Sequence, residues 1–422
     1  MNKPKIRFKG FEGEWKEKAL GDVVDEFKYG INAAAVSYDG ENKYLRITDI
    51  DEGSRAFIKD ELASPDADLS SCNEYIMQDG DIVIARTGAS VGKSYIYHPI
   101  DGKVYFAGFL IRARVNKNVD REFVFQNTLT DGFKKYIRFV SQRSGQPGVN
   151  AEELKSYLMN LPASLPEQRA IASYFTSLDA QITASTSRLS SLKQIKAASQ
   201  LNMFPQKGET VPRVRFKGFQ GEWKEMQFGV AFEYQRNNSL SRAELSDEGI
   251  VANIHYGDVL IKYGDCLDVS KDVLTYVKDK KIGMALYKKG ALRNGDVIFA
   301  DAAEDNTVGK CTEVICEENV CIISGLHTIA CRPQVEVVER YLGCSLNSPS
   351  FHNQLLPHIQ GTKISSISKN ALSSTSIFLP SLPEQRAIAS YFTALDAQIT
   401  LQRERLEKLK QIKAACLEKM FA

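Results

Sequence analysis

Two long stretches of the chain carry apolar residues at alternating spacings of four and three, the pattern of a helix that packs along one face. Each stretch follows a helix-start signal, with Ser164 or Ser381 three residues before a glutamate and a proline in the first turn. The pattern predicts two helices of about 40 residues, which would be roughly 55–60 Å long. Their inward-facing positions, here called the stripe residues, are Ile171, Phe175, Leu178, Ile182, Ser185, Leu189 and Leu192 in the first and Ile388, Phe392, Leu395, Ile399, Gln402, Leu406 and Leu409 in the second.

The two stripes match in length and register, so each helix offers the other an equivalent partner. We therefore expect the helices to pack against each other, antiparallel, as a coiled-coil strut with one globular domain at each end. A pseudo-twofold axis would cross this strut. The alternative is that each helix lies on the surface of its own domain.

The segment before each helix alternates between short strand patterns and turns. Strands are predicted near residues 44–50, 81–85 and 105–115, a helix over 121–140, and a glycine-containing loop over 143–150. The second segment repeats the order with different residues. The predicted fold class is mixed α/β, with two globular domains and two long helices.

Two segments of the chain occur twice. Residues 7–17 return as 215–225 with one change, and residues 165–176 return unchanged as 382–393. The residues between these segments differ strongly. Such a repeat indicates a duplicated architecture in which one scaffold carries two different surfaces. The predicted organisation is a first globular domain, a first long helix, a second globular domain and a second long helix, at residues 1–160, 161–210, 211–378 and 379–422.

Composition restricts the class of protein. The chain has 422 residues, 43% hydrophobic and 25% charged, with a formal net charge of +2, all ordinary for a globular protein of more than one domain. It contains no apolar run of membrane-spanning length and no apolar segment near Met1, so we expect a cytoplasmic protein. The eight cysteines form no Cys-x-x-Cys pair, which favours reduced thiols over a metal site.

The paired segments at residues 161–171 and 379–388, and the Gly-Glu-Trp segments at Trp15 and Trp223, resemble the specificity subunit of type I restriction–modification systems. The resemblance covers essentially the whole chain. It implies two target recognition domains, each reading one half of a split double-stranded DNA sequence, and helices that act as a ruler and dock two methyltransferase subunits.

The resemblance also implies which chemistry belongs to other chains. Motor-nuclease subunits would join for restriction. S-adenosylmethionine, ATP and magnesium would bind in the partner subunits, with no cofactor on this chain, and the methyl acceptor would be the N6 of adenine. Independently, two dissimilar domains on a rigid strut predict an asymmetric bipartite target whose half-sites lie about one helical turn apart.

Motifs for catalysis are missing from the sequence. Residues 88–94 resemble a phosphate-binding loop, but only three residues separate the glycines where four are needed. Two interpretations of this loop remain: its lysine contacts a DNA phosphate, or the loop is a plain exposed turn. No Pro-Pro pair of an aminomethyltransferase occurs, and the five histidines are scattered. We expect a subunit without an active site.

Base recognition needs forked donors and amides on loops held by a rigid sheet. The candidates in the first domain are Arg46, Arg86, Thr87, Ser90, Lys93, Arg143, Gln146 and Asn150. Those in the second are Asn253, His255, Asn306, Lys310, His327, Gln360, Thr362 and Lys363. The duplicated helix starts offer two methyltransferases the same surface, so the predicted docking residues are Glu167, Gln168, Arg169, Glu384, Gln385 and Arg386.

Three other functions stay open at this point. A stand-alone DNA-binding regulator would bind a specific sequence without a methyltransferase. A scaffold whose variable domains bind proteins would show no sequence preference for DNA. A fused restriction–methylation enzyme would need the motifs that are missing.

Overall fold

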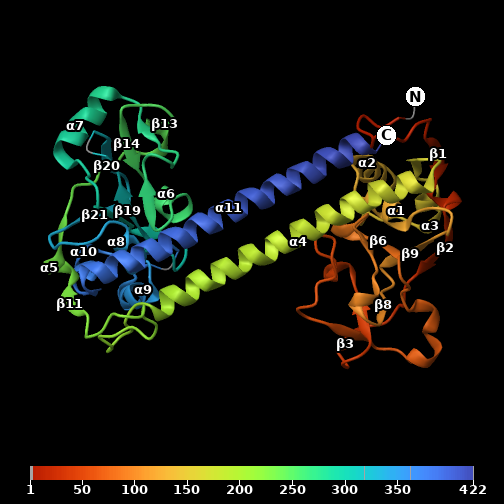
Figure 1. Ribbon diagram of the computed structural model, residues 1–422, viewed down its shortest axis with the longest axis horizontal. Coiled ribbons are helices and arrows are strands. Elements are labelled where there is room, and N and C mark those ends of the chain that lie inside the picture. The colour runs from red at the N-terminus through yellow and green to blue at the C-terminus, as the bar shows by residue number, and fades with distance from the viewer. Residues whose placement is uncertain (1–2, 318, 362, 422) are drawn as a thin grey trace. The chain divides into compact units, whose positions relative to one another are not determined.

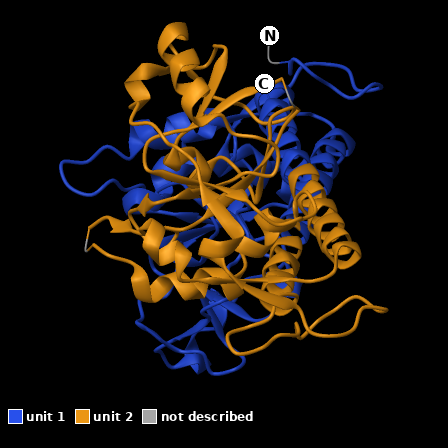
Figure 2. Ribbon diagram, turned by 90° about the vertical axis from the view of Figure 1, so that its left-hand side faces the viewer, with its two compact units in different colours: residues 1–188, 402–422 blue, residues 189–401 orange. Residues whose placement is uncertain are grey.

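The computed structural model describes residues 3–317, 319–361 and 363–421. The chain forms two compact units, coloured separately in Figure 2. Unit 1 comprises residues 1–188 and 402–422, and unit 2 comprises residues 189–401. Each unit therefore combines one variable segment with a part of both long helices.

The two predicted long helices are present as α4 (Leu165–Asn202, 38 residues) and α11 (Leu382–Met420, 39 residues), both labelled in Figure 1. Every stripe residue is buried or half-buried, and those still partly exposed are Ile182, Leu189 and Leu409. This confirms both the helix lengths and the inward face that the spacing predicts.

In unit 1 the first half of α4 packs against the last part of α11. The ring of Phe175 lies 5.7 Å from that of Phe421, and the Lys413 amine donates to the Asp179 carboxylate at 2.5 Å. These contacts join the beginning of one helix to the end of the other. The helices are therefore antiparallel here.

Unit 2 contains the counterpart contacts with the roles of the helices exchanged. Phe392 lies 6.0 Å from Phe204, and the Lys196 amine donates to Asp396 at 2.6 Å. Lys196 also forms an ion pair at 2.7 Å with Asp265 of the variable segment. Antiparallel packing of α4 and α11 is thus confirmed within each unit, which sets aside the alternative of two separate surface helices.

The globular part of unit 1 is built on a four-stranded antiparallel sheet in the order β2-β9-β6-β7. Smaller pairs are β1 with β10, β3 with β5 and the parallel pair β4 with β8. The strands are β1 Lys16–Ala19, β2 Val24–Tyr29, β3 Ala35–Ser37, β4 Lys43–Leu45, β5 Ala63–Pro65, β6 Ile82–Ala85, β7 Ser94–Ile96, β8 Val104–Phe106, β9 Leu110–Val115 and β10 Leu158–Leu161. The helices are α1 Arg121–Asn127, α2 Asp131–Val140 and α3 Ala151–Lys155.

Unit 2 repeats this plan with additions. Its five-stranded sheet has the order β12-β21-β17-β19-β15, and a second sheet has the order β13-β16-β14-β20. The strands are β11 Lys224–Gln227, β12 Phe232–Tyr234, β13 Leu245–Ser246, β14 Val251–Ile254, β15 Cys266–Asp268, β16 Tyr276–Val277, β17 Val297–Ala300, β18 Ala302–Ala303, β19 Cys311–Ile315, β20 Cys321–Ser324, β21 Thr328–Pro333, β22 Ser365–Ser366 and β23 Ser376–Leu379. The helices are α5 Phe228–Ala231, α6 Tyr256–Ile261, α7 Lys280–Gly290, α8 Tyr341–Leu346, α9 Pro349–Leu355 and α10 Lys369–Ser373.

Three predicted elements are shorter than expected, two of them because a side chain redirects the backbone. The strand over 44–50 ends at Leu45, since the Asp49 carboxylate accepts from the Arg46 backbone N–H and closes a turn. The helix over 121–140 divides in two, because the Thr130 hydroxyl caps the start of α2. The strand over 105–115 becomes β8 and β9 with a turn between them.

Candidate nucleic-acid interface

Three segments of unit 1 meet where strand β6 ends. The Arg86 backbone N–H donates to the Phe109 carbonyl at 2.9 Å, and the Val149 N–H donates to the Arg86 carbonyl at 2.8 Å. The Gly88 N–H donates to the Pro147 carbonyl at 2.9 Å. The fold thus brings together the loop after β6, the turn before β9 and the loop before α3, and these segments hold every predicted residue of the first domain except Arg46.

Gly88 is required at this meeting point. Its φ is +69°, and a Cβ at this position would lie 2.7 Å from the Gln146 side-chain nitrogen. The Gln146 side chain therefore lies directly over the loop that follows β6, with its residue exposed to solvent. An exposed side-chain amide is the kind of group that reads a base edge.

Unit 2 has the same arrangement after strand β17. The Asp301 N–H donates to the His327 carbonyl at 3.1 Å, and the Ile367 N–H donates to the Asp301 carbonyl at 3.0 Å. The loop carrying Gln360 closes on itself through backbone bonds to Ser366 at 2.8 and 3.0 Å. The predicted residues Asn306, His327, Gln360 and Lys363 are exposed on this set of loops, and Thr362 lies outside the described residues.

Two exposed candidates of unit 1 are engaged within their own loop. The Arg143 guanidinium donates to the Glu153 carboxylate at 2.5 Å. The Asn150 side chain accepts from the Glu153 backbone N–H at 2.9 Å and caps helix α3. Both residues fix the end of the 143–150 loop.

The lysines of the two glycine-lysine loops hold their domains together. Lys93 donates to the Ile50 carbonyl at 3.1 Å and pairs with Glu52 at 3.2 Å. Lys310 donates to the carbonyls of Leu260 and Tyr263 at 2.9 and 3.0 Å, and burial lowers the pKa of its amine. The structure gives both lysines an internal partner in place of an exposed position.

Three further candidates are also occupied internally. The Arg46 guanidinium is paired with Asp49 at 2.7 Å. Asn253 is fully buried and accepts from the Asn238 amide at 2.7 Å. His255 is buried at the start of helix α6, where its Nδ1 accepts from a backbone N–H and burial lowers the pKa of the ring.

Sequence reasoning missed two aromatic residues at the meeting point of unit 1. Phe109 is 58% exposed at the turn before β9, and an apolar residue directly after Gly108 in a turn was the available signal. Tyr29 lies under the Arg86 guanidinium, whose carbon is 4.8 Å from the ring centroid. The contact between Tyr29 and Arg86 joins segments distant in sequence, so no local pattern predicts it.

The duplicated segments form a buried ionic contact in each unit. Arg7 donates to both Glu167 oxygens at 2.7 and 2.8 Å, and the Trp15 indole adds a bond at 3.3 Å. In unit 2, Arg215 donates to Glu384 at 2.6 and 2.7 Å. These carboxylates, which belong to the predicted helix-start signals, tie the duplicated segments together.

The glutamines that follow are internal as well. The Gln168 side chain accepts from the Asp120 N–H at 2.9 Å, and that of Gln385 accepts from the Val338 N–H at 2.9 Å. Glu167, Gln168, Glu384 and Gln385 are each no more than 3% exposed. Burial withdraws these four from the predicted docking surface and leaves Arg169 and Arg386, which are exposed.

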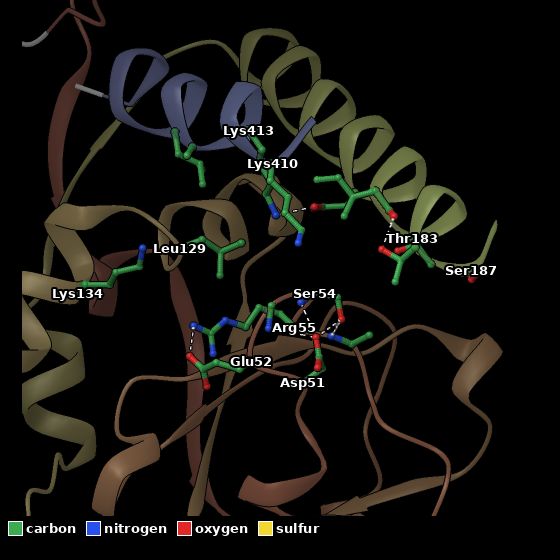
Figure 3. A pocket seen from close by; sticks show the side chains of 17 residues that line it. Asp51, Glu52, Ser54, Arg55, Leu129, Lys134, Thr183, Ser187, Lys410 and Lys413 are labelled. Atoms are coloured by element: carbon green, nitrogen blue, oxygen red, sulfur yellow. Dashed lines mark hydrogen bonds and ion pairs between the residues drawn. The ribbon is translucent and has the colours of Figure 1, made fainter. Parts of the chain in front are cut away.

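Unit 1 also contains a cavity of about 640 Å³ between residues 51–56 and the long helices (Figure 3). Its lining mixes cations and anions, and Lys413 is already paired with Asp179 while Arg55 is paired with Glu52. Such a lining lacks the single sign of charge that concentrates a charged ligand.

Neither a metal-binding cluster nor a phosphate-binding loop is found in the part of the chain that the structure describes. No group of three or more His, Cys, Asp or Glu residues could hold a metal there. Residues 88–90 form a 3-10 turn and Ser94 begins strand β7, whereas a phosphate-binding loop leads into a helix. Across residues 3–317, 319–361 and 363–421, no helix combines the length and the apolar character needed to cross a membrane.

Comparison with known proteins relates the whole chain to one group. The family model described as type I restriction modification DNA specificity domain matches residues 12–194 and again residues 220–411. A type I restriction enzyme specificity subunit, MjaVIII, from Methanocaldococcus jannaschii is 19% identical over 413 residues, covering 95% of this chain and 90% of the relative.

Two solved structures share the fold. The S subunit of a type I restriction-modification system from M. genitalium has a TM-score of 0.62 at 13% identity, covering 100% of this chain and 99% of the other. A chain from a study of complex assembly and conformational transition of the type I R-M system has a TM-score of 0.53 at 18% identity, covering 96% and 97%.

Proposed function

Because the chain belongs to the type I restriction modification DNA specificity domain family, it is a specificity subunit with two target recognition domains, and we propose that each domain reads one half of a bipartite double-stranded DNA target. One observation carries the proposal. The same backbone frame occurs after β6 in unit 1 and after β17 in unit 2, and it presents different side chains. Equal frames with unequal side chains are suited to two different half-sites.

Within this proposal the exposed and half-buried residues of the meeting points make the base contacts. In unit 1 these are Arg86, Thr87, Ser90 and Gln146, and in unit 2 they are Asn306, His327, Gln360 and Lys363. The internally paired candidates, among them Lys93 and Lys310, position these loops. Residues 1–160 and 211–378 are then the two recognition domains, and residues 161–210 and 379–422 the two conserved helices.

The paired helices fix the spacing between the two half-sites and dock two methyltransferase subunits. Arg169 and Arg386 lie at equivalent positions near the helix starts, exposed and without an acceptor among the described residues, and each is offered to one methyltransferase. Adenine methylation, and cleavage by motor-nuclease subunits, take place on those partners, which bind S-adenosylmethionine, ATP and magnesium. The complex works on DNA in the cytoplasm.

The first test is a genome-wide map of DNA methylation in the host with and without this gene. We expect a split, asymmetric motif that disappears on deletion. Exchange of residues 226–378 for the corresponding block of a relative must then change one half of the motif only. A motif altered in both halves, or in neither, would contradict the division between the domains.

A protein without methyltransferase partners would give a different result. A stand-alone DNA-binding regulator would leave the methylation map unchanged but would still select one sequence from randomised duplexes. A scaffold for other proteins would select none.

A further inference from the structure

One backbone position is the same in both units to the level of individual hydrogen bonds. Arg86 and Asp301 are each the first residue after the central strand of their sheet. The residue before each pairs with the first residue of the neighbouring strand, Ala85 with Leu110 and Ala300 with Thr328. The position is therefore equivalent in strand register.

Its two backbone hydrogen bonds are equivalent too. The amide of Arg86 donates to the carbonyl before β9, and the amide of Asp301 donates to the carbonyl before β21, at 2.9 and 3.1 Å. The carbonyl of Arg86 accepts from the loop before α3 at 2.8 Å, and the carbonyl of Asp301 accepts from the loop before α10 at 3.0 Å. The two side chains therefore leave the sheet at the same place while carrying opposite charge.

Neither side chain has all of its polar atoms occupied. The Arg86 guanidinium stacks on the Tyr29 ring, its Nη1 lies 3.5 Å from the Gly108 carbonyl, and no described residue accepts from its Nη2. Asp301 contacts the His327 ring through Oδ1 at 3.3 Å, and its Oδ2 has no donor in the described part of the chain. Burial raises the pKa of the Asp301 carboxyl, and the neighbouring histidine opposes that rise.

Opposite charges have opposite partners on DNA. A guanidinium pairs with the O6 and N7 acceptors of guanine, whereas a carboxylate accepts from an exocyclic amino group of a base. A carboxylate gains nothing from phosphates, which repel it, so its favourable partner in the groove is an amino group. Attraction to the DNA phosphates, which would account for a lysine or an arginine, cannot explain an aspartate at this position.

We propose that Arg86 and Asp301 are equivalent specificity-determining residues, with Arg86 contacting the guanine of a G·C pair in one half-site and Asp301 contacting the amino group of cytosine or adenine in the other. This rests on the proposed function, since it requires both units to read DNA. It adds Asp301 to the recognition residues and assigns base chemistry to both positions.

The test is the methylation map of hosts in which the gene is replaced by Asp301→Asn, Arg86→Lys or a control, Glu304→Gln. The control removes a carboxylate charge at an exposed position three residues from Asp301. Loss of one forked or charged contact should reduce discrimination at one base pair by roughly 5- to 140-fold. Each of the two variants should therefore relax one position, in different halves of the motif, and E304Q none.

The outcomes separate the inference from the function it rests on. A wild-type host without any split motif would contradict the proposed function itself. A normal wild-type motif that D301N and R86K leave unchanged at every position would overturn the inference alone, as would an A·T pair at the position that R86K relaxes. If D301N abolishes methylation by misfolding unit 2, R86K in unit 1 still decides the outcome by the same two criteria.

Discussion

The buried pair of Arg215 and Glu384 should be essential to the stability of unit 2, and the substitution Glu384→Gln tests it. Glu384 is 1% exposed and the Arg215 side chain 14%, so the neutral amide would leave a guanidinium with little access to water. Breaking a buried pair by removing one partner destabilises by about 3–5 kcal/mol, and the partial exposure of Arg215 favours the lower end. At a urea m-value of about 2 kcal/mol/M, a loss of about 3 kcal/mol shifts the unfolding midpoint by about 1.5 M.

The chain supplies its own probes for this measurement. Its two tryptophans are divided between the units, with Trp15 in unit 1 and Trp223 in unit 2, so a W15F background reports unit 2 alone by fluorescence. The matched control is Glu225→Gln, which removes an exposed carboxylate from the same duplicated segment. A Trp223 midpoint that moves no further in E384Q than in E225Q would refute the importance of the pair.

Three further predictions concern the other ionic groups. Lys196→Met removes the cation that Asp265 and the partly exposed Asp396 share. It should lower the free energy of unfolding of unit 2 by about 2–3 kcal/mol in urea, whereas Lys193→Met, at an exposed position, should leave it unchanged. Burial raises the pKa of the Glu313 carboxyl to about 7, above its unfolded value of about 4.3, so its stabilisation is complete below about pH 4 and is lost as the pH rises through 7. Glu313→Gln should therefore flatten the fall in unit 2 stability between about pH 4 and 7. Arg169→Ala combined with Arg386→Ala should reduce co-purification of the methyltransferase roughly tenfold, which corresponds to about 1.4 kcal/mol of binding, while binding of the free chain to duplex DNA stays unchanged.

Sequence periodicity predicted the long helices because their stripe residues recur along one element and must meet a second apolar face. Their mutual pairing followed from the matching length and register of the two stripes. Local patterns failed where a single side chain redirects the backbone. The hydroxyl of Thr130, for example, caps α2 and divides a helix whose apolar spacing looks continuous.

The candidate site was predictable as a region and only partly by residue. Matching loops before the short helices indicated where candidate residues for base recognition gather, and Gln146 and Gln360 are exposed there. The sequence places Lys93 and Lys310 in loops in the same way, yet their amines donate to backbone carbonyls some 40 to 50 residues away. Partners this remote leave no local signal, so a polar residue in a loop cannot be assigned to solvent or to the interior from its neighbours alone.

Whether a contact is made by side chains or by the backbone explains which parts of the duplication stay identical. Arg7, Glu167 and their counterparts interact through side chains, so changing either partner leaves a buried charge unpaired. Arg86 and Asp301 are held through backbone amides and carbonyls, which every residue except proline provides. A frame fastened by its backbone tolerates any change of side chain at the positions of Arg86 and Asp301, except to proline, without loss of its hydrogen bonds. Two recognition domains can therefore diverge in the bases they read while the ionic contacts that hold them to the helices remain fixed.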